Sequence, residues 1–183
     1  TPVIYFDMVL DESRGWIYGS DSDGNKIDVI STTTQELVKS FVLVNGATPK
    51  GIALSPDGSE LVVAQNGASS LLFLNPDTGA TIATIIPNVS NPKLPYDVIY
   101  GRNGRLYSSG NPDAAGLDYI HVINTATHTE VSRSGSTMRS SPYLALSSDK
   151  NSLFANSTGI PNYLYKFNVS TDTIPTPTST TYT

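Results

Sequence analysis

Residues 49–85 read PKGIALSPDGSELVVAQNGASSLLFLNPDTGATIATI and contain four short apolar runs. Turn-forming sequences separate the runs: Pro56-Asp57-Gly58, then Asn66-Gly67-Ala68, then the Asn-Pro-Asp-Thr-Gly segment 75–79. Short apolar runs joined in this way are typical of antiparallel strands linked by tight turns. The stretch therefore predicts one four-stranded antiparallel sheet in which each strand pairs with the next.

The same pattern recurs along the chain at a nearly constant period. The leading aliphatic residues of the second strands are 44, 45 and 47 residues apart, and the last residues of the third strands are 44, 49 and 44 apart. The first set is Ile17, Leu61, Leu106 and Leu153, and the second set is Ile30, Leu74, Ile123 and Phe167. A period of about 40–50 residues that carries four strands is typical of a β-propeller blade.

The repeat predicts an all-β fold, a β-propeller with four four-stranded antiparallel blades in a single domain that covers residues 1–183. The expected blades span about residues 3–44, 48–87, 94–135 and 140–182. A four-stranded sheet cannot bury both of its faces alone, so neighbouring blades have to cover one another.

The resemblance to a known family is strongest in residues 48–87. The pattern Pro-x-Gly-Ile-Ala-Leu-Ser-Pro-Asp-Gly-x-x-Leu from Pro49, followed by the Asn-Pro-Asp-Thr-Gly turn, resembles the YVTN family of β-propeller repeats of surface-layer and exported proteins. The later units match this pattern more loosely, and the first keeps little of it. The resemblance implies a closed ring of about seven blades, and this chain supplies four.

Four blades leave two end faces to be explained. The chain could be part of a longer propeller, could pair with another chain to complete a ring, or could close as a four-bladed ring. Closure removes free sheet edges. Because the end blades of an open arc present apolar faces, we expect the isolated chain to self-associate.

Composition limits the classes of partner and the location. The net charge is −5, the pI is about 4.8 and only 15% of residues are charged, which argues against a nucleic-acid partner because phosphate binding needs a basic face. No apolar run approaches the ~18–20 residues that span a bilayer, so we expect no membrane span. Low charge, abundant Ser and Thr and an acidic pI favour an extracellular or cell-surface location. Cysteine is absent, which excludes disulfides and thiolate sites.

One segment resembles a metal-binding loop. Asp21-Ser22-Asp23-Gly24-Asn25, with Asp28 downstream, places oxygen ligands at alternate positions, as a hard cation such as Ca²⁺ prefers. The glycine and the missing twelfth-position acid do not fit a helix–loop–helix calcium site. Asp, Gly and Asn are also the natural residues of a hairpin loop, so we predict a hairpin between the second and third strands and no metal.

Neither histidine lies in a sequence context that indicates catalysis. His121 falls inside a third strand and His128 in the turn after it. Neither histidine has a carboxylate at a position in the sequence that indicates a catalytic pair. A catalytic pair needs a partnered base or nucleophile. No nucleophile elbow, phosphate-binding loop or dinucleotide fingerprint occurs. The sequence therefore predicts no catalytic residues and no cofactor.

Loops on a rigid scaffold are the natural binding elements. Between the second and third strands they are expected at residues 21–25, 66–69, 111–118 and 159–162, and the candidate binding residues in the last three are Asn66, Asn111, Asp113 and Asn162. Aromatic residues could line a ligand-binding face or could pack between blades, and packing is the favoured interpretation. These aromatic residues are Tyr107, Tyr143, Tyr163, Tyr165 and Phe167.

Three functions remain open. A repeat without a catalytic constellation favours a non-catalytic scaffold or interaction module of an exported or cell-surface protein, with a protein or glycan partner. The alternatives are part of a hydrolase of the lactonase type, with its site at the ring mouth, and a carbohydrate-binding propeller. Three or more inward carboxylates or histidines at one mouth would favour the enzyme. The fold alone does not decide between these functions, because propellers host many activities.

Overall fold

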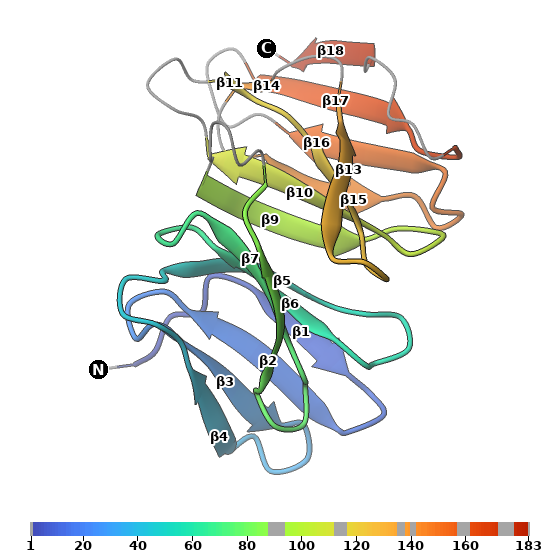
Figure 1. The fold of residues 1–183 in the computed structure, drawn as a ribbon. Coiled ribbons are helices and arrows are strands. Elements are labelled where there is room, and N and C mark those ends of the chain that lie inside the picture. The colour runs from blue at the N-terminus through green and yellow to red at the C-terminus, as the bar shows by residue number, and fades with distance from the viewer. Residues whose placement is uncertain are drawn as a thin grey trace.

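The computed structural model describes residues 2–87, 94–111, 117–134, 138–139, 142–156, 162–171 and 178–182. In these ranges the regular elements are β-strands, and no helix long and apolar enough to cross a membrane occurs among them. The strands of the four large sheets follow one another as meanders (Figure 1).

Each large sheet is one blade, numbered here in chain order. Blade 1 contains β1(Met8–Asp11), β2(Trp16–Asp21), β3(Lys26–Ser31) and β4(Leu37–Val42). Blade 2 contains β5(Pro49–Leu54), β6(Leu61–Gln65), β7(Ser70–Leu74) and β8(Thr81–Ile85). Blade 3 contains β9(Leu94–Tyr100), β10(Arg105–Asn111), β12(His121–Asn124) and β13(Thr129–Arg133). Blade 4 contains β15(Tyr143–Leu146), β16(Ser152–Asn156), β17(Asn162–Asn168) and β18(Thr178–Tyr182). Each sheet lies inside one of the four predicted residue ranges.

The two sets of landmark residues pair directly with each other in every blade. The register joins Ile17 to Ile30, Leu61 to Leu74, Leu106 to Ile123 and Leu153 to Phe167. These residues are therefore structurally equivalent, which confirms the repeat as a repeat of whole sheets. Four residues separate the second and third strands in blades 1 and 2, whereas blade 3 reaches the same register across a longer connection between β10 and β12.

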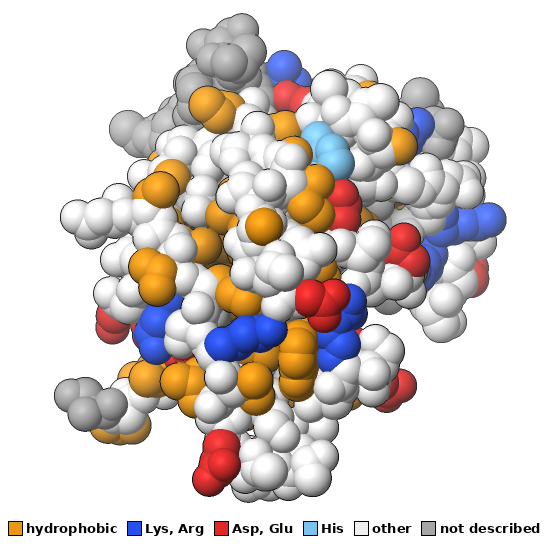
Figure 2. All heavy atoms as spheres, turned by 60° about the horizontal axis from the view of Figure 1, so that its bottom comes forward, with side chains coloured by type: hydrophobic (Ala, Val, Ile, Leu, Met, Phe, Trp, Pro, Cys, Tyr) orange, Lys and Arg blue, Asp and Glu red, His pale blue; other side chains and the backbone are white. Residues whose placement is uncertain are grey.

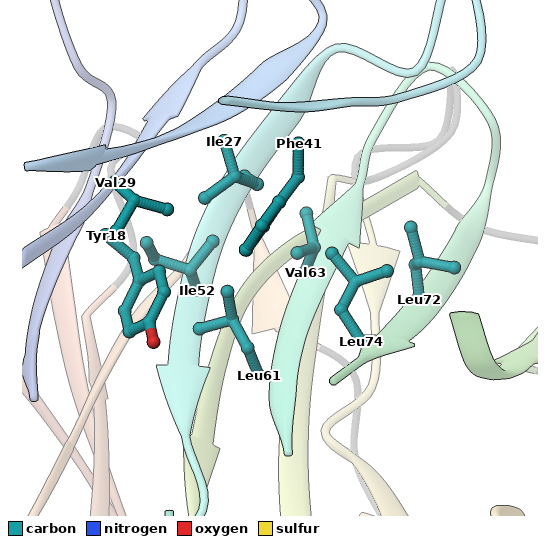
Figure 3. Close-up of a cluster of buried hydrophobic side chains, with 9 residues drawn as sticks. All are labelled: Tyr18, Ile27, Val29, Phe41, Ile52, Leu61, Val63, Leu72 and Leu74. Carbon is teal, nitrogen blue, oxygen red and sulfur yellow. The ribbon is translucent and has the colours of Figure 1, made fainter. Parts of the chain in front are cut away.

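The core lies between the blades. We call the side of a blade that faces the next blade along the chain its forward face, and the opposite side its rear face. On the forward face of blade 1, Tyr18 and Val29 are buried against the rear face of blade 2, which supplies Leu61 and Leu74 (Figure 3). The same arrangement recurs between blades 2 and 3 and between blades 3 and 4. Blades 1 and 4 lie at opposite ends of the molecule (Figure 1).

Polar contacts also join neighbouring blades. The Arg14 guanidinium binds both carboxylate oxygens of Asp77 in blade 2, with Nε 2.7 Å from Oδ1 and Nη2 2.9 Å from Oδ2, and it also contacts Asp11 of its own blade. This bidentate geometry fixes the direction of both partners as well as their distance. It therefore helps to set the angle between the first two blades.

The structure departs from the predicted loops in blade 3 and blade 4. Two short strands, β11(Leu117–Asp118) and β14(Met138–Arg139), form a separate antiparallel pair that the sequence pattern does not indicate. Asn111 and Asn162, predicted in loops, are instead the last residue of β10 and the first residue of β17. In both cases the strand runs further than its apolar run, because backbone pairing does not require apolar side chains at strand ends.

Candidate binding surface at the mouth of the inner strands

The first strands of the four blades, β1, β5, β9 and β15, line a concave surface. A cavity of about 520 Å³ follows this surface, and residues of all four blades contribute to its lining. Around one of its ends lie Phe6, Asp7, Ile52, Asp97, Tyr143 and Leu144. Concave sites between repeated elements are common ligand sites, so this surface is the candidate functional site.

Three aromatic rings from three blades meet at this end. Phe6 of blade 1 lies 5.2 Å from Tyr96 of blade 3 and 6.2 Å from Tyr143 of blade 4, measured between ring centroids. The two tyrosine rings are 5.4 Å apart, and the Tyr96 hydroxyl donates a hydrogen bond of 3.2 Å to the Tyr143 hydroxyl. Lys50 of blade 2 places its ammonium 4.5 Å from the Phe6 ring centroid, within cation–π range. We call Phe6, Lys50, Tyr96 and Tyr143 the aromatic mouth.

Two carboxylates lie next to the aromatic mouth, and each joins one blade to the next. Asp7 accepts hydrogen bonds from the Met8 amide at 2.8 Å and from the Ile52 amide of blade 2 at 2.9 Å. Asp97 accepts them from the Val98 amide at 2.8 Å and from the Leu144 amide of blade 4 at 2.7 Å. Each carboxylate therefore binds the amide of the next residue with one oxygen and an amide across the blade boundary with the other.

Burial dominates the protonation equilibria of both carboxyl groups. Burial raises the pKa of Asp97 to about 6, against the lowering effect of the Leu144 and Val98 amides, and the negative charge of Asp7 raises it further. Burial also raises the pKa of Asp7, opposed by the amides of Ile52 and Met8. The charged form of a buried carboxylate loses hydration that two amide donors only partly replace.

Acidification from pH 7 to pH 5 is expected to stabilise the fold through Asp97. The folded-state pKa of about 6 lies above the unfolded value of 3.8, so the folded protein binds the extra proton and stability falls as pH rises through this window. Linkage gives a gain of about 1 kcal/mol in the wild type between pH 7 and pH 5. Urea unfolding of the wild type and of Asp97→Asn at both pH values measures this gain, and the variant should lose the part of it that comes from Asp97.

A matched control for this titration is Asp57→Asn. Hydrogen bonds from Ser55 and Ser59 hold the pKa of Asp57 at about 2, so this carboxyl group does not titrate between pH 7 and pH 5. Asp57→Asn should therefore keep the wild-type pH dependence in this range. An Asp97→Asn variant that keeps it too would contradict the assignment to Asp97.

Three of the four predicted binding residues lie among the described residues, and none of the three belongs to the aromatic mouth. Asn66 lies in the turn between β6 and β7, and its side-chain amide donates a 3.0 Å hydrogen bond to the Pro95 carbonyl of blade 3, a structural link between blades. Asn111 and Asn162 lie at strand ends, as described above, and Asp113 lies outside the described residues. Their role in binding stays a prediction.

Both histidines have carboxylate partners, which corrects the expectation from their sequence context. His121 Nδ1 is 2.7 Å from Glu130 Oε1 within blade 3, and His128 Nε2 is 2.8 Å from Glu60 Oε1 of blade 2. Glu60 and Glu130 are brought there by strand pairing and by blade stacking, which sequence distance does not reveal. His121 is buried in β12.

The segment 21–25 forms the predicted hairpin between β2 and β3. Asp21 Oδ1 accepts the Gly24 amide at 2.8 Å, and the nearest cation to Asp28 is the Lys26 ammonium at 2.8 Å. Among the described residues no group of three or more His, Asp or Glu side chains is arranged to hold a metal ion. Among the described residues that line the cavity, the carboxylates are those of Asp7 and Asp97.

Of the predicted aromatic residues, Tyr107 and Phe167 are buried between blades 3 and 4, and Tyr165 packs against the same cluster. Tyr143 differs, because it is 47% exposed and belongs to the aromatic mouth. The importance of Phe6, Asp7, Tyr96 and Asp97 was missed from the sequence. A usable signal was present, since Phe6-Asp7-Met8-Val9 and Tyr96-Asp97-Val98-Ile99 share the order aromatic, Asp, aliphatic, aliphatic.

Comparison with known proteins adds evidence on the fold. No family model matches the sequence, and no curated protein matches it significantly. Similar solved structures include hydrazine synthase of Kuenenia stuttgartiensis, with a TM-score of 0.81 at 16% identity over 97% of this chain and 49% of that one. A streptogramin B lyase has a TM-score of 0.73 at 18% identity, over 97% of this chain and 54% of that one. A chain of a mitotic checkpoint complex has a TM-score of 0.76 at 15% identity, over 98% of this chain and 54% of that one.

The chain thus spans about half the length of these structural neighbours. Their identities are too low to transfer an activity, and they include enzymes as well as an assembly protein, as expected for a fold that hosts many functions. Their structural likeness agrees with the stacked four-stranded sheets described above. The chain therefore has the β-propeller fold, with four blades arranged as in part of a larger propeller.

Proposed function

We propose that the chain is a non-catalytic binding module of an exported or cell-surface protein, of the YVTN type, and that its ligand contacts the aromatic mouth. The observation that carries this proposal is the hydrogen bonding of the two carboxylates beside the mouth. Both oxygens of Asp7 and both oxygens of Asp97 accept backbone amides, and one amide in each case belongs to the next blade. Groups used in this way hold blades together and are poorly placed to act as bases.

The aromatic mouth has the chemistry of a recognition surface. Aromatic side chains offer large contact areas at low conformational cost, and tyrosine adds a hydroxyl for hydrogen bonding. Tyr143 is half exposed, and Lys50 adds a positive charge at the same place. A glycan or an extended peptide can stack on such rings and hydrogen-bond to their polar groups. The low charge and acidic pI support the exported or surface location.

The test is the binding of the intact chain to an immobilised glycan panel and to an extended-peptide library, comparing wild type with Tyr143→Ala. Removing an exposed central aromatic residue should weaken binding by about tenfold or more. Tyr163→Ala is the matched control, since Tyr163 belongs to the same blade and contacts Tyr165 instead. Equal binding by wild type and Tyr143→Ala would refute the aromatic mouth as the binding site.

A hydrolase of the lactonase type is the second candidate, and one observation favours it. Glu60 and His128 form a carboxylate–imidazole pair across blades 2 and 3, and the Tyr100 hydroxyl lies 3.4 Å from the second Glu60 oxygen. A carboxylate can orient a histidine that acts as a base. Turnover of lactones or esters by the purified chain, lost in His128→Ala, would support the hydrolase over the binding module.

A further inference from the structure

Lys50 is the basic residue of the aromatic mouth, and its ammonium has no acidic partner among the described residues. The side chain is half-buried, and Nζ lies 4.5 Å from the centroid of the Phe6 ring. An ammonium that is partly removed from water without a counter-charge loses hydration that the protein does not replace. An anionic group of a ligand would supply the missing counter-charge.

Lys39 shows the difference, because it makes the same kind of ring contact in blade 1. Its ammonium lies 4.3 Å from the Trp16 ring centroid and also donates a hydrogen bond to the Asp77 carbonyl of blade 2. Within the described part of the chain, no carbonyl or carboxylate oxygen accepts a hydrogen bond from Lys50. The three ammonium donors of Lys50 therefore remain for a ligand.

The two carboxylates beside the mouth are already used. Each of the four carboxylate oxygens of Asp7 and Asp97 accepts a backbone amide, and neither carboxylate forms an ion pair with Lys50. The amides turn the positive ends of their dipoles toward the two carboxylates and oppose their negative charge. The positive charge of Lys50 is therefore left to interact with a ligand.

The same hydrogen bonds argue against an extended peptide as the ligand. A peptide that adds to the edge of a sheet pairs with the free amides of the edge strand. At the mouth the two carboxylates bind one amide from the first strand of every blade. These amides are those of Met8, Ile52, Val98 and Leu144. A peptide backbone would have to displace the carboxylates, whereas a ligand that uses side-chain contacts alone would not.

The tyrosines of the mouth supply those side-chain contacts. The Tyr96 hydroxyl donates its hydrogen to the Tyr143 hydroxyl at 3.2 Å. Because a tyrosine hydroxyl can accept and donate at once, the hydrogen of the Tyr143 hydroxyl is available to an oxygen of the ligand. The Tyr143 side chain is also 47% exposed, so its ring offers a flat apolar surface to a sugar ring. An ammonium and a hydroxyl are both donors that suit a carboxylate.

Charge over the rest of the protein gives an acidic ligand no general attraction. The net charge is −5 and only 15% of residues are charged. Figure 2 shows charged side chains in small groups among larger uncharged areas on one face of the molecule. Recognition of a negative group therefore depends on a local contact, which Lys50 provides at the mouth.

We infer that the ligand of the aromatic mouth is an acidic glycan, one whose sugar rings carry carboxylates. A carboxylate of the glycan binds the Lys50 ammonium and the Tyr143 hydroxyl, and a sugar ring stacks on the exposed ring of Tyr143. The inference rests on the proposed binding function and adds the chemical class of the ligand to it.

Isothermal titration calorimetry of the intact chain tests the class of ligand. The probes are an oligogalacturonate and a hyaluronan oligosaccharide, the neutral methyl ester of each, and an oligoglutamate peptide. At least one acidic oligosaccharide should bind about tenfold or more tightly than its ester, because the ester lacks the charged acceptor. Equal binding of acid and ester, or no binding of either acid, would refute the inference. Tighter binding of oligoglutamate than of both acids would refute the glycan and assign the carboxylate to a peptide.

Variants of Lys50 separate this inference from the proposed function. Lys50→Met keeps the apolar stem and should weaken binding of the acidic oligosaccharide by about tenfold or more, whereas Lys50→Arg should retain binding. Lys39→Met is the matched control, since it removes a lysine over an aromatic ring of blade 1, and it should bind as the wild type does. Circular dichroism checks the fold of each variant. Wild-type binding by Lys50→Met together with weak binding by Tyr143→Ala would overturn the inference and leave the proposed binding function in place.

Discussion

Replacing Phe73 with alanine is expected to lower the free energy of unfolding by about 3–5 kcal/mol, the usual cost of removing a buried aromatic side chain. Phe73 is fully buried on the forward face of blade 2, in the cluster that includes Leu106 and Ile123 of blade 3. Its ring also lies 4.6 Å from the His128 ring in an edge-to-face contact. The variant therefore loses contacts on both sides of a blade interface, and urea unfolding measures the loss.

Ile82→Ala provides the control for this measurement. Ile82 lies on β8 of the same blade and is 44% exposed, so its truncation should cost less than about 1 kcal/mol. If Phe73→Ala and Ile82→Ala are equally stable, the interface between blades 2 and 3 is not the core of the fold.

Replacing Gly51 with alanine is expected to cost about 1–3 kcal/mol through overpacking of the same interface. A Cβ atom on Gly51 would lie 2.5 Å from Asp97 Oδ1, 2.7 Å from Asp97 Cα and 3.0 Å from the Tyr96 carbonyl oxygen. Two of these atoms belong to the backbone of β9, so rotation of a side chain cannot relieve the contact. Blades 2 and 3 have to separate at the aromatic mouth, and thermal unfolding should show the loss.

The double variant Gly51→Ala/Asp97→Ala separates the two sources of this cost. Shortening Asp97 removes the contact with its carboxylate and leaves the contacts with its Cα and with the Tyr96 carbonyl. The effects of the two substitutions should therefore be non-additive, since the residues touch. Wild-type stability in Gly51→Ala alone would show that the two blades are not packed as closely as described.

Gly51 and Asp97 also connect stability with the proposed binding surface. Glycine at position 51 makes room for the carboxylate that bonds to blade 4, and the same strands carry Lys50 and Tyr96 of the aromatic mouth. Substitutions that separate these strands should weaken ligand binding as well as folding. Tyr143, which is exposed at the mouth, can be removed with little effect on the core.

The sequence by itself determined the strands and their grouping into blades. The spacing of Ile17, Leu61, Leu106 and Leu153 predicted four equivalent sheets, and the hairpin at 21–25 was predicted from its turn residues. These features are local, because a turn type depends on a few adjacent residues and an antiparallel strand then pairs with its neighbour. The ends of the strands were less predictable, as Asn111 and Asn162 show.

Only the tertiary structure decided which distant residues meet. Phe6 and Tyr143 come from the first and last blades and stack at one mouth, and His128 reaches Glu60 only because blade 3 packs on blade 2. Asp97 becomes a link to Leu144 for the same reason. Such contacts depend on the distance and angle between stacked sheets, which the packing of whole faces sets and which no short stretch of sequence contains.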